Sequence, residues 1–529
     1  MTARVTAAGS ATRLPPAVLD PLLERVVATP RADRVETRAP FTGEVLAAVP
    51  QSTPDDVLLA VEQARSAQHD WARRSVHDRG QVLLRLHDLV LDRQREVLDL
   101  VQLESGKSRA HAYEEVADVA IVARHYARRA HGYLRPRRRA GLVPGLTVTH
   151  EVRHPKGVVG IIAPWNYPLT LAISDALPAL MAGNGVVLKP DSQTPLTALW
   201  AVQALVDAGL PEGLFGVVVG DGGVIGPAVV DAVDYVCFTG STATGRGVAA
   251  RAGERLVGAS LELGGKNAMY VADDVDVDVA AEGAVRACFA SAGQLCISIE
   301  RLLVHEDVAD AFVAAFVRRV QALRLGRSLD YSADVGSLVS RAQLERVEAH
   351  VRDAVDKGAT VLAGGRALPE VGPLFYAPTV LDGVGEDADC HAAETFGPVV
   401  SIYRVASDAE AVRRANDTPF GLNASVWTAD VGRGRRIARA IRAGTVNVNE
   451  GYIATWGSVA APMGGMKDSG LSRRHGAEGI TKYTETQTVS VQLGAHRGLG
   501  TGRFFSLPAE RWTAGFTGGL RVLKAAGWR

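Results

Sequence analysis

The sequence predicts an α/β protein built on a doubly wound parallel sheet, and three observations lead to that fold class. From about residue 155, short apolar runs alternate with longer stretches of roughly 15–20 residues, which are long enough for crossover helices. The runs are continuously apolar and rich in β-branched residues, as expected of strands buried on both faces. Proline or glycine follows four of them, at Pro164, Pro190, Gly220 and Gly240. The predicted strands are 158–163, 186–188, 217–219, 235–238 and 261–263.

The turn after the fourth run is a candidate phosphate site. It reads Phe238-Thr239-Gly240-Ser241-Thr242-Ala243-Thr244-Gly245 and opens a predicted helix. A Gly-Ser-Thr turn at a helix N-terminus offers backbone N–H groups and hydroxyls to a pyrophosphate. Glycine and threonine also cap ordinary helices, and no G-x-G-x-x-G fingerprint follows the first strand. The turn by itself is therefore only a weak indication of a nucleotide.

Composition narrows the class of protein. The 529 residues correspond to about three domains of ~150 residues, enough for a cleft between large cores. With 58 basic and 58 acidic residues, the formal charge is zero, so no global field would recruit nucleic acid or a membrane surface. No run of eighteen apolar residues occurs. The four cysteines lack disulfide or zinc-ligand spacing, which predicts a reducing compartment, by default the cytoplasm, and no metal.

Two residues in separate glycine-flanked stretches are candidates for covalent catalysis. Cys296 follows a predicted helix over 276–292 that Gly293 ends, and Glu262 lies 34 residues upstream at the end of a predicted strand. A thiolate can add to a carbonyl carbon, and a nearby carboxylate can activate the water that later cleaves the thioester. A lone cysteine is more often a small buried hydrophobe, so the pair needs further support.

That support comes from a series of motifs. Asn166 lies in a P-W-N-Y-P segment, where it could serve as a neutral oxyanion donor or simply cap a turn between two prolines. Together the segments resemble the aldehyde dehydrogenase superfamily, in its order and with its spacing between base and nucleophile. They are Pro164–Pro168, Leu188–Pro195, Phe238–Gly245, Leu261–Lys266, Gly293–Cys296, Glu394–Pro398, Asn447–Asn449 and Pro462–Gly470.

The resemblance implies a role for each matched position. Cys296 would be the nucleophile, Glu262 the base and Asn166 part of the oxyanion hole. The cofactor would contact Trp165, Lys189, Ser192, Gly240, Ser241, Gly245, Leu263, Glu394 and Phe396. The activity implied is oxidation of an aldehyde to its acid with reduction of NAD(P)+. Two alternatives remain: an acylating relative that passes the thioester to coenzyme A, which typically lacks the Glu at position 262, and a non-catalytic protein that kept the fold.

The family also implies a layout. A cofactor-binding domain is expected over 20–133 and 156–263, and a catalytic domain over 264–463. Bridging strands that join subunits are expected from 138–155 and 484–497, giving a homodimer or homotetramer. Residues 1–19 are predicted to form a flexible tail. The extension 498–529 is predicted to carry a short amphipathic helix docked on the protein's own surface rather than on a membrane.

A few positions are expected to decide whether the protein prefers NADP or NAD. Members that prefer NAD commonly have Glu where this chain has Ser192, so Ser192 and Lys189 predict NADP, with NAD possible; Asp191 opposes this if it points inward.

The closest resemblance is to the bacterial succinate-semialdehyde dehydrogenase (NADP+) branch. Its two carboxylate-binding arginines are replaced here by Ser174 and Ala290. We therefore expect succinate semialdehyde to be accepted but not to be the best substrate, unless an arginine from elsewhere, such as Arg301, reaches the site. The expected pocket comprises Tyr167, Leu171, Ser174, Leu295, Ile297 and Trp456.

Overall fold

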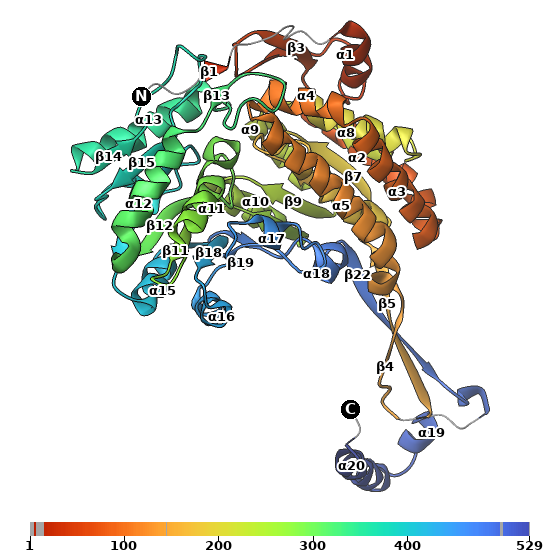
Figure 1. The fold of residues 1–529 in the computed structure, drawn as a ribbon. Helices are drawn as coiled ribbons and strands as arrows, with labels where there is room; N and C mark the ends of the chain where they lie inside the picture. The colour runs from red at the N-terminus through yellow and green to blue at the C-terminus, as the bar shows by residue number, and fades with distance from the viewer. Residues whose placement is uncertain (1–4, 7–14, 144, 498–500, 528–529) are drawn as a thin grey trace.

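The computed structural model describes residues 5–6, 15–143, 145–497 and 501–527 (Figure 1). Most of the expected N-terminal tail, and residues 498–500 and 528–529 of the C-terminal extension, lie outside the described residues. Within the tail, β1 (Val5–Thr6) pairs in parallel with β13 (Leu325–Gly326), and α1 begins at Pro16. No helix among the described residues is long and apolar enough to cross a membrane.

A six-stranded sheet forms the centre of the first structural unit. Its strand order is β21-β10-β9-β6-β7-β8, and every neighbouring pair is parallel except β10 with β21. The five strands expected from the sequence are all present in this sheet, with ends shifted by one to three residues. The strands are β6 (Val158–Ile162), β7 (Gly185–Lys189), β8 (Phe215–Val217), β9 (Tyr235–Thr239), β10 (Gly258–Glu262) and β21 (Gly470–Leu471).

Helices bury both faces of this sheet, which explains its continuous apolar runs. On β7, Val187 packs into the core formed with α2, α9 and α10, whereas its neighbour Leu188 packs into the core on the opposite face. A hairpin of β2 (Arg34–Arg38) and β3 (Val45–Pro50) lies near the N-terminus. The helices of this unit are α1 (Pro16–Leu23), α2 (Pro54–Arg73), α3 (Val76–Asp92), α4 (Gln94–Ser105), α5 (Arg109–Leu134), α6 (Thr170–Ile173), α7 (Ala176–Met181), α8 (Pro195–Asp207), α9 (Gly222–Ala232) and α10 (Thr242–Glu254).

The second unit contains a seven-stranded sheet in the order β14-β15-β16-β12-β11-β18-β19, parallel except for β14. Residues of β11 alternate between two cores, Met269 on one face and Tyr270 on the other. Its strands are β11 (Asn267–Val271), β12 (Ile299–His305), β14 (Thr360–Ala363), β15 (Thr379–Asp382), β16 (Val399–Val405), β18 (Asn423–Trp427) and β19 (Thr445–Val448). Its helices are α11 (Val277–Phe289), α12 (Glu306–Gln321), α13 (Arg341–Asp356), α14 (Asp389–Ala392), α15 (Asp408–Asn416), α16 (Val431–Ala440) and α17 (Ile453–Trp456).

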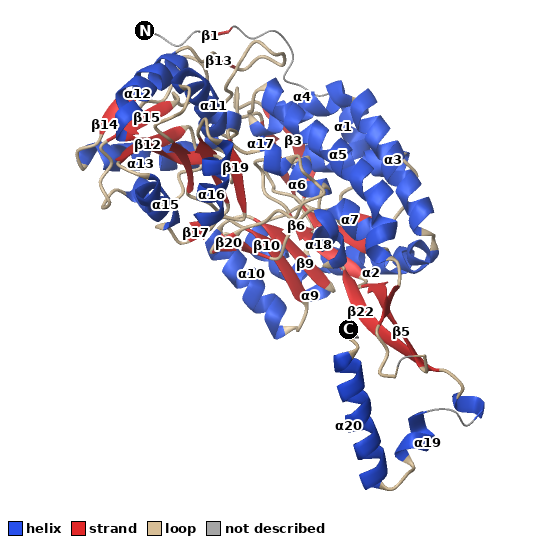
Figure 2. Cartoon of the chain, turned by 60° about the horizontal axis from the view of Figure 1, so that its bottom comes forward, coloured by secondary structure: helices blue, strands red, loops and turns tan. Residues whose placement is uncertain are grey.

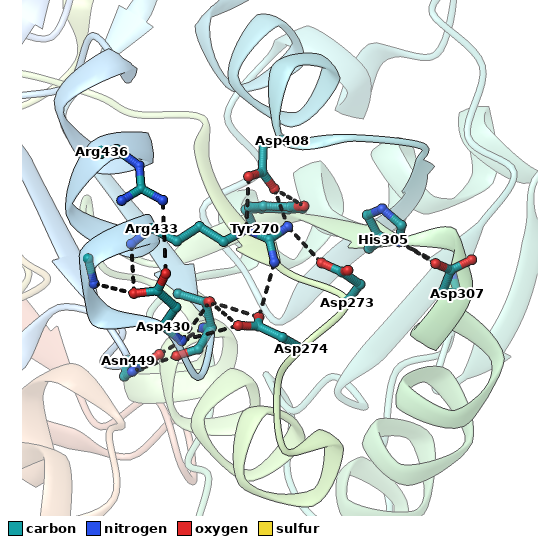
Figure 3. A network of polar contacts seen from close by, with 12 residues as sticks. Tyr270, Asp273, Asp274, His305, Asp307, Asp408, Asp430, Arg433, Arg436 and Asn449 are labelled. Carbon is teal, nitrogen blue, oxygen red and sulfur yellow. Dashed lines mark hydrogen bonds and ion pairs between the residues drawn. The ribbon is translucent and has the colours of Figure 1, made fainter.

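Arg433 of α16 ties the elements of this second unit together (Figure 3). Its guanidinium binds Asp273, which follows β11, and Asp408 at the start of α15, each at 2.6 Å. Asp273 also lies near His305 and Asp307, and these three form a group with metal-like spacing among the described residues. Since Asp273 is already bound to Arg433, we interpret this network as a structural tie.

An arm projects from the body of the molecule (Figure 1). It is a three-stranded antiparallel sheet ordered β22-β5-β4, with β4 (Arg137–Arg139), β5 (Thr147–Pro155) and β22 (Thr484–Gln492). Helix α18 (Gly476–Thr481) precedes β22. Beyond the arm follow α19 (Thr501–Phe505) and α20 (Ala509–Ala525). The expected terminal helix thus exists, but the expectation that it docks on the protein's own surface is wrong: it has no buried residue and lies away from both units (Figure 2).

Candidate active site

A strained loop presents Cys296. Helix α11 begins after Asp276, whose carboxylate accepts from the backbone N–H groups of the first turn, and ends at Phe289, followed by a short 3₁₀ turn to Gly293. Within that turn Ser291 and Ala292 have φ of 51° and 55°, a left-handed conformation that costs about 1–3 kcal/mol for a residue with a Cβ. A Cβ on Gly293 would lie 2.0 Å from the Gly397 carbonyl oxygen, so only glycine fits there.

Gln294 holds this loop in place. Its side-chain oxygen accepts from the Val339 N–H at 3.0 Å, and its amide nitrogen donates to the carbonyls of Ser291 and Ser337. Cys296 then falls in a turn before β12 and remains partly exposed, whereas the other three cysteines are buried. A buried glutamine with three hydrogen bonds fixes a backbone well, so the thiol has a defined position.

Asn166 lies beside the nucleophile loop. It follows β6, is 5% exposed, and its side-chain amide donates to the Gln294 carbonyl at 3.1 Å. The Asn166 carbonyl accepts from the Lys107 ammonium at 2.7 Å. The structure therefore brings the predicted oxyanion donor into contact with the segment that carries Cys296.

A buried ion pair supports the Asn166 loop. Lys107 binds Glu115 of α5 at 2.6 Å, and neither side chain is exposed to solvent. Glu115 also accepts from the backbone N–H groups of Leu169 and Thr170, at 2.8 and 3.1 Å. Sequence reasoning missed both charged residues. The one sequence feature that could have indicated the ion pair is the adjacent pair of acidic residues Glu114 and Glu115, which lies in a helix whose other residues are suited to burial.

Glu262 ends β10 and faces the same region. It is 9% exposed, and burial raises the pKa of its carboxyl to about 7. Nearby cations oppose this shift, chiefly Arg474, which itself binds Asp175 at 2.6 Å. A carboxyl with a pKa near neutrality can accept a proton from water at physiological pH. A Cβ on Gly464 would lie 3.0 Å from its Oε1, so the 464 loop covers the carboxylate closely.

The surroundings of the Cys296 thiol favour its protonated form. Burial, together with the carboxylates of Glu394 and Glu262, raises its pKa to about 12, while Arg474 acts in the opposite direction. Since only the thiolate is an effective nucleophile, the proton must leave when substrate and cofactor are bound.

A small pocket opens onto Cys296. Five of the six expected substrate residues line it: Tyr167, Leu171, Leu295, Ile297 and Trp456. Ser174 does not, because its hydroxyl is buried and donates to Asp118 at 2.5 Å. Arg301 is also elsewhere, since its guanidinium donates to three backbone carbonyls. The lining residues that sequence reasoning missed are Glu114, Thr170, Tyr452, Met463 and Arg474.

A larger cavity of about 840 Å³ lies along the carboxyl ends of the first sheet, between the N-termini of α9 and α10. Four of the expected cofactor residues line it: Trp165, Lys189, Gly240 and Ser241. The size suits a nucleotide, and two helix N-termini favour phosphate. Asp191 also lines it, and the Lys189 ammonium makes no hydrogen bond within the described residues, so it is available to a ligand.

The remaining cofactor candidates do not line this cavity. The Ser192 hydroxyl donates to the Gly220 carbonyl at 2.9 Å. Gly245 and Leu263 instead pack together, since a Cβ on Gly245 would lie 2.4 Å from the leucine side chain. Gly245 lies in the first turn of α10, and Leu263 follows β10 directly.

Glu394 and Phe396 approach from the second unit. Glu394 accepts from the Gly265 N–H at 2.8 Å, and burial raises the pKa of its carboxyl to about 8. The Phe396 ring meets Trp165 edge-to-face at 5.4 Å, with φ of 59° in the phenylalanine backbone. Glu300, which binds the buried Lys266, accepts from the Phe396 N–H at 2.9 Å and so holds this loop against the cavity.

The fold and its two cavities define a nucleotide-binding α/β enzyme, and comparisons with known proteins agree. Residues 27–489 match the model of the aldehyde dehydrogenase family. A Mycolicibacterium smegmatis protein named "Putative succinate-semialdehyde dehydrogenase, NADP(+)" is 54% identical over 85% of this chain and 87% of its own length. The mitochondrial succinate-semialdehyde dehydrogenase of Oryza sativa is 36% identical over 86% of each chain.

Solved structures are similar throughout the fold. An NADP-dependent enzyme from E. coli superposes with a TM-score of 0.84 at 34% identity, covering 87% of this chain and 95% of that one. An indole-3-acetaldehyde dehydrogenase in complex with NAD+ gives 0.83 at 34% identity, covering 88% and 94%. The chain belongs to the aldehyde dehydrogenase family, and its reaction is the oxidation of an aldehyde to the carboxylic acid.

Proposed function

We propose that Cys296, Asn166 and Glu262 carry out this oxidation, with NADP+ as the preferred acceptor and NAD+ as a possible one. The observation that carries the proposal is that Cys296 and Asn166 line one pocket and that Glu262 lies near Cys296. The Glu262 carboxylate is close enough to alter the pKa of the Cys296 thiol.

In the first step, the Cys296 sulfur attacks the aldehyde carbon and the carbonyl π electrons move onto oxygen. The Asn166 amide and the Cys296 N–H donate to that oxyanion, and one such donor is worth about 10²–10³ in rate. A bound oxidised nicotinamide would supply the acceptor for the hydride that leaves this carbon, and the adduct would then be a thioester. The proton lost from the thiol passes to solvent, directly or through Glu262, so that Glu262 is a carboxylate again before the second step.

In the second step, Glu262 removes a proton from a water molecule, which attacks the thioester carbon. The carbon–sulfur bond breaks, the acid leaves, and the Cys296 thiolate is restored. The presence of this carboxylate supports water as the acyl acceptor and not coenzyme A. The retention of a thiol, a donor and a base around one pocket supports an enzyme and not a structural relative.

The NADP preference is supported by the cavity in the first unit. Lys189 ends β7, and its ammonium lies near the start of α9, since a Cβ on Gly222 would be 3.6 Å from Nζ. An ammonium and a helix N-terminus together suit the 2′-phosphate. Asp191 lines the same cavity and opposes it, and the Ser192 hydroxyl is already engaged, so the phosphate would rely on Lys189.

For the substrate, we propose that succinate semialdehyde is accepted but is not preferred. The relatives' names support acceptance. The pocket does contain an arginine from elsewhere in the chain, Arg474 and not Arg301, but its guanidinium is paired with Asp175 at 2.6 Å. A distal carboxylate would have to compete with that buried partner, whereas an uncharged chain gains from contact with the apolar lining.

We further propose a homo-oligomer that works in the cytoplasm, with the arm as the contact between subunits. The cofactor-binding domain would comprise 20–133 and 156–263, the catalytic domain 264–463, and the bridging strands 138–155 and 484–497. The isolated projection of the arm and the exposed apolar side chains of β22 support this division.

The deciding experiment compares two variants in rapid-mixing assays with butanal and NADP+. Cys296→Ala should abolish production of reduced cofactor. Glu262→Gln should release one equivalent in a burst and then stall at the thioester, because the steps need different groups. Steady turnover of Glu262→Gln near the wild-type rate would contradict the role given to Glu262.

A further inference from the structure

A carboxylate forms part of the wall of the substrate pocket. Glu114, on the first turns of α5, accepts a hydrogen bond from the Tyr167 hydroxyl at 3.0 Å and from the Tyr452 hydroxyl at 2.8 Å. Both tyrosines are buried, at 4% and 3% exposure, while Glu114 is only partly covered. Three chain segments far apart in sequence therefore fix one acid beside the path of the substrate.

The other charged groups of this wall already have ionic partners. Arg474 binds Asp175, and Lys107 binds Glu115, each pair at 2.6 Å. Glu114, by contrast, is hydrogen-bonded to two neutral hydroxyls. Burial raises the pKa of Glu114, whereas the two tyrosine hydroxyls and the Lys107 ammonium favour its charged form. The pocket wall thus presents an acidic group to which no cation is hydrogen-bonded among the described residues, and a cation bound beside it would stabilise its charged form.

Aromatic rings surround the same space. Tyr167, Tyr452 and Trp456 all line the pocket. The buried Lys107 ammonium packs against the Tyr167 ring from outside the pocket, 3.6 Å from the ring centre. Ring faces attract ammonium groups by roughly 0.5–2 kcal/mol, and most strongly when the site is desolvated.

We infer that Glu114 is a specificity-determining residue that selects aldehydes bearing a distal ammonium group over aldehydes bearing a distal carboxylate. The reactive end of such a substrate lies at Cys296, and its cationic end faces Glu114 and the Trp456 ring. A substrate carboxylate in the same place faces a like charge and no free cation. This inference rests on the proposed function, since it concerns the same pocket and the same reaction.

The test compares three aldehydes of similar chain length: γ-trimethylaminobutyraldehyde, butanal and succinate semialdehyde. For each protein, kcat/KM of the charged aldehydes is divided by that of butanal, so that any general loss of activity cancels. The wild-type enzyme should favour the cationic aldehyde over the anionic one by tenfold or more, about 1.4 kcal/mol. Glu114→Gln should reduce that ratio at least tenfold.

A matched control changes a neighbouring charge outside the pocket lining. Glu450 interacts electrostatically with Glu114, but its carboxylate accepts from the Ala454 N–H. If direct contact with Glu114 sets the preference for the cationic aldehyde, and not the electrostatic field of neighbouring charges, Glu450→Gln should change the ratio less than twofold. Tyr452→Phe retains the Glu114 charge and should keep the cationic preference, which protects the test if Glu114→Gln folds poorly.

A second measurement does not require turnover of the charged compound. Butyltrimethylammonium should inhibit butanal oxidation competitively and more strongly than butyrate, and Glu114→Gln should abolish that difference. A wild-type preference for succinate semialdehyde, or a ratio unchanged in Glu114→Gln, overturns the inference. Failure to oxidise any of the three aldehydes would instead overturn the proposed function.

Discussion

The Lys107 ammonium lies 2.7 Å from the Asn166 carbonyl, and the Asn166 amide in turn donates to the Gln294 carbonyl, two residues before Cys296. A buried cation thus supports the loop that carries the oxyanion donor. The same ammonium binds Glu115, whose carboxylate accepts from the backbone N–H groups of Leu169 and Thr170 in the same loop. The ion pair therefore positions the Asn166 donor from the side away from the pocket.

Lys107→Met should therefore impair both stability and turnover. Removing one partner of a buried pair leaves Glu115 uncompensated, which typically costs about 3–5 kcal/mol. We expect a lower midpoint in urea unfolding and a fall in kcat of about tenfold or more with butanal, with a smaller change in KM. The double variant Lys107→Met/Glu115→Gln should recover stability but not kcat. Full activity of the single variant would show that the pair has no positioning role.

The rate of thioester hydrolysis should depend on the protonation of Glu262. Burial raises its pKa from 4.5 to about 7, so the carboxylate form is lost as pH falls through about 7. Where hydrolysis limits turnover, kcat should fall on the acid side of that pH. Single-turnover bursts should be measured in parallel, because the Cys296 thiol also becomes more reactive at higher pH. A flat kcat from about pH 5.5 to 8 with hydrolysis limiting would contradict this assignment.

The cofactor preference should depend on Lys189. Lys189→Ala should lower kcat/KM for NADP+ about tenfold or more, the size expected from a charge-assisted hydrogen bond of about 1.5–3 kcal/mol. The loss with NAD+, which lacks the 2′-phosphate, should be smaller and serves as the internal control. Ser192→Glu should shift selectivity toward NAD+. A strong preference of the wild-type protein for NAD+ would refute the proposal.

The arm should join subunits. Strand β22 ends its sheet, so one edge is unpaired within the described residues, and its Val489 and Val491 side chains are 41% and 50% exposed. Such an edge is normally covered by another chain. Light scattering at micromolar concentration should give a dimer or a dimer of dimers, and the double variant Val489→Lys/Val491→Lys should give a smaller species. A monomeric wild-type mass would rule the contact out.

Local pattern was sufficient to predict the central strands and the elements around Cys296. Strands buried on both faces produce continuous apolar runs, and Asp276 lies where the start of α11 requires it. The predicted end at Gly293 was wrong, because α11 ends at Phe289 and a 3₁₀ turn with left-handed residues follows. Short motifs that resemble the family indicated Asn166 and Glu394. These residues could be found in this way because they contact residues of other motif segments.

Residues whose role depends on packing between distant segments could not be predicted in this way. Glu114 and Arg474 reach the pocket from α5 and from the loop before α18, and Lys107 reaches the Asn166 carbonyl from the segment before α5. No short motif connects these three residues. Ser174 has the spacing of a pocket residue, but Asp118 draws its hydroxyl into the core. The place of α20 was also unpredictable, because an amphipathic pattern specifies a face and not its partner.

The pairing of β10 with β21 constrains the order in which the chain can fold. These neighbouring strands are separated by residues 263–469, which include the whole seven-stranded sheet. During synthesis at ~5–20 residues per second, β10 must wait roughly ten to forty seconds for its partner. Throughout that time the nascent first sheet presents an open edge, and Glu262 lacks the loop that covers it. The surroundings of Glu262 are therefore completed among the last steps of folding during synthesis.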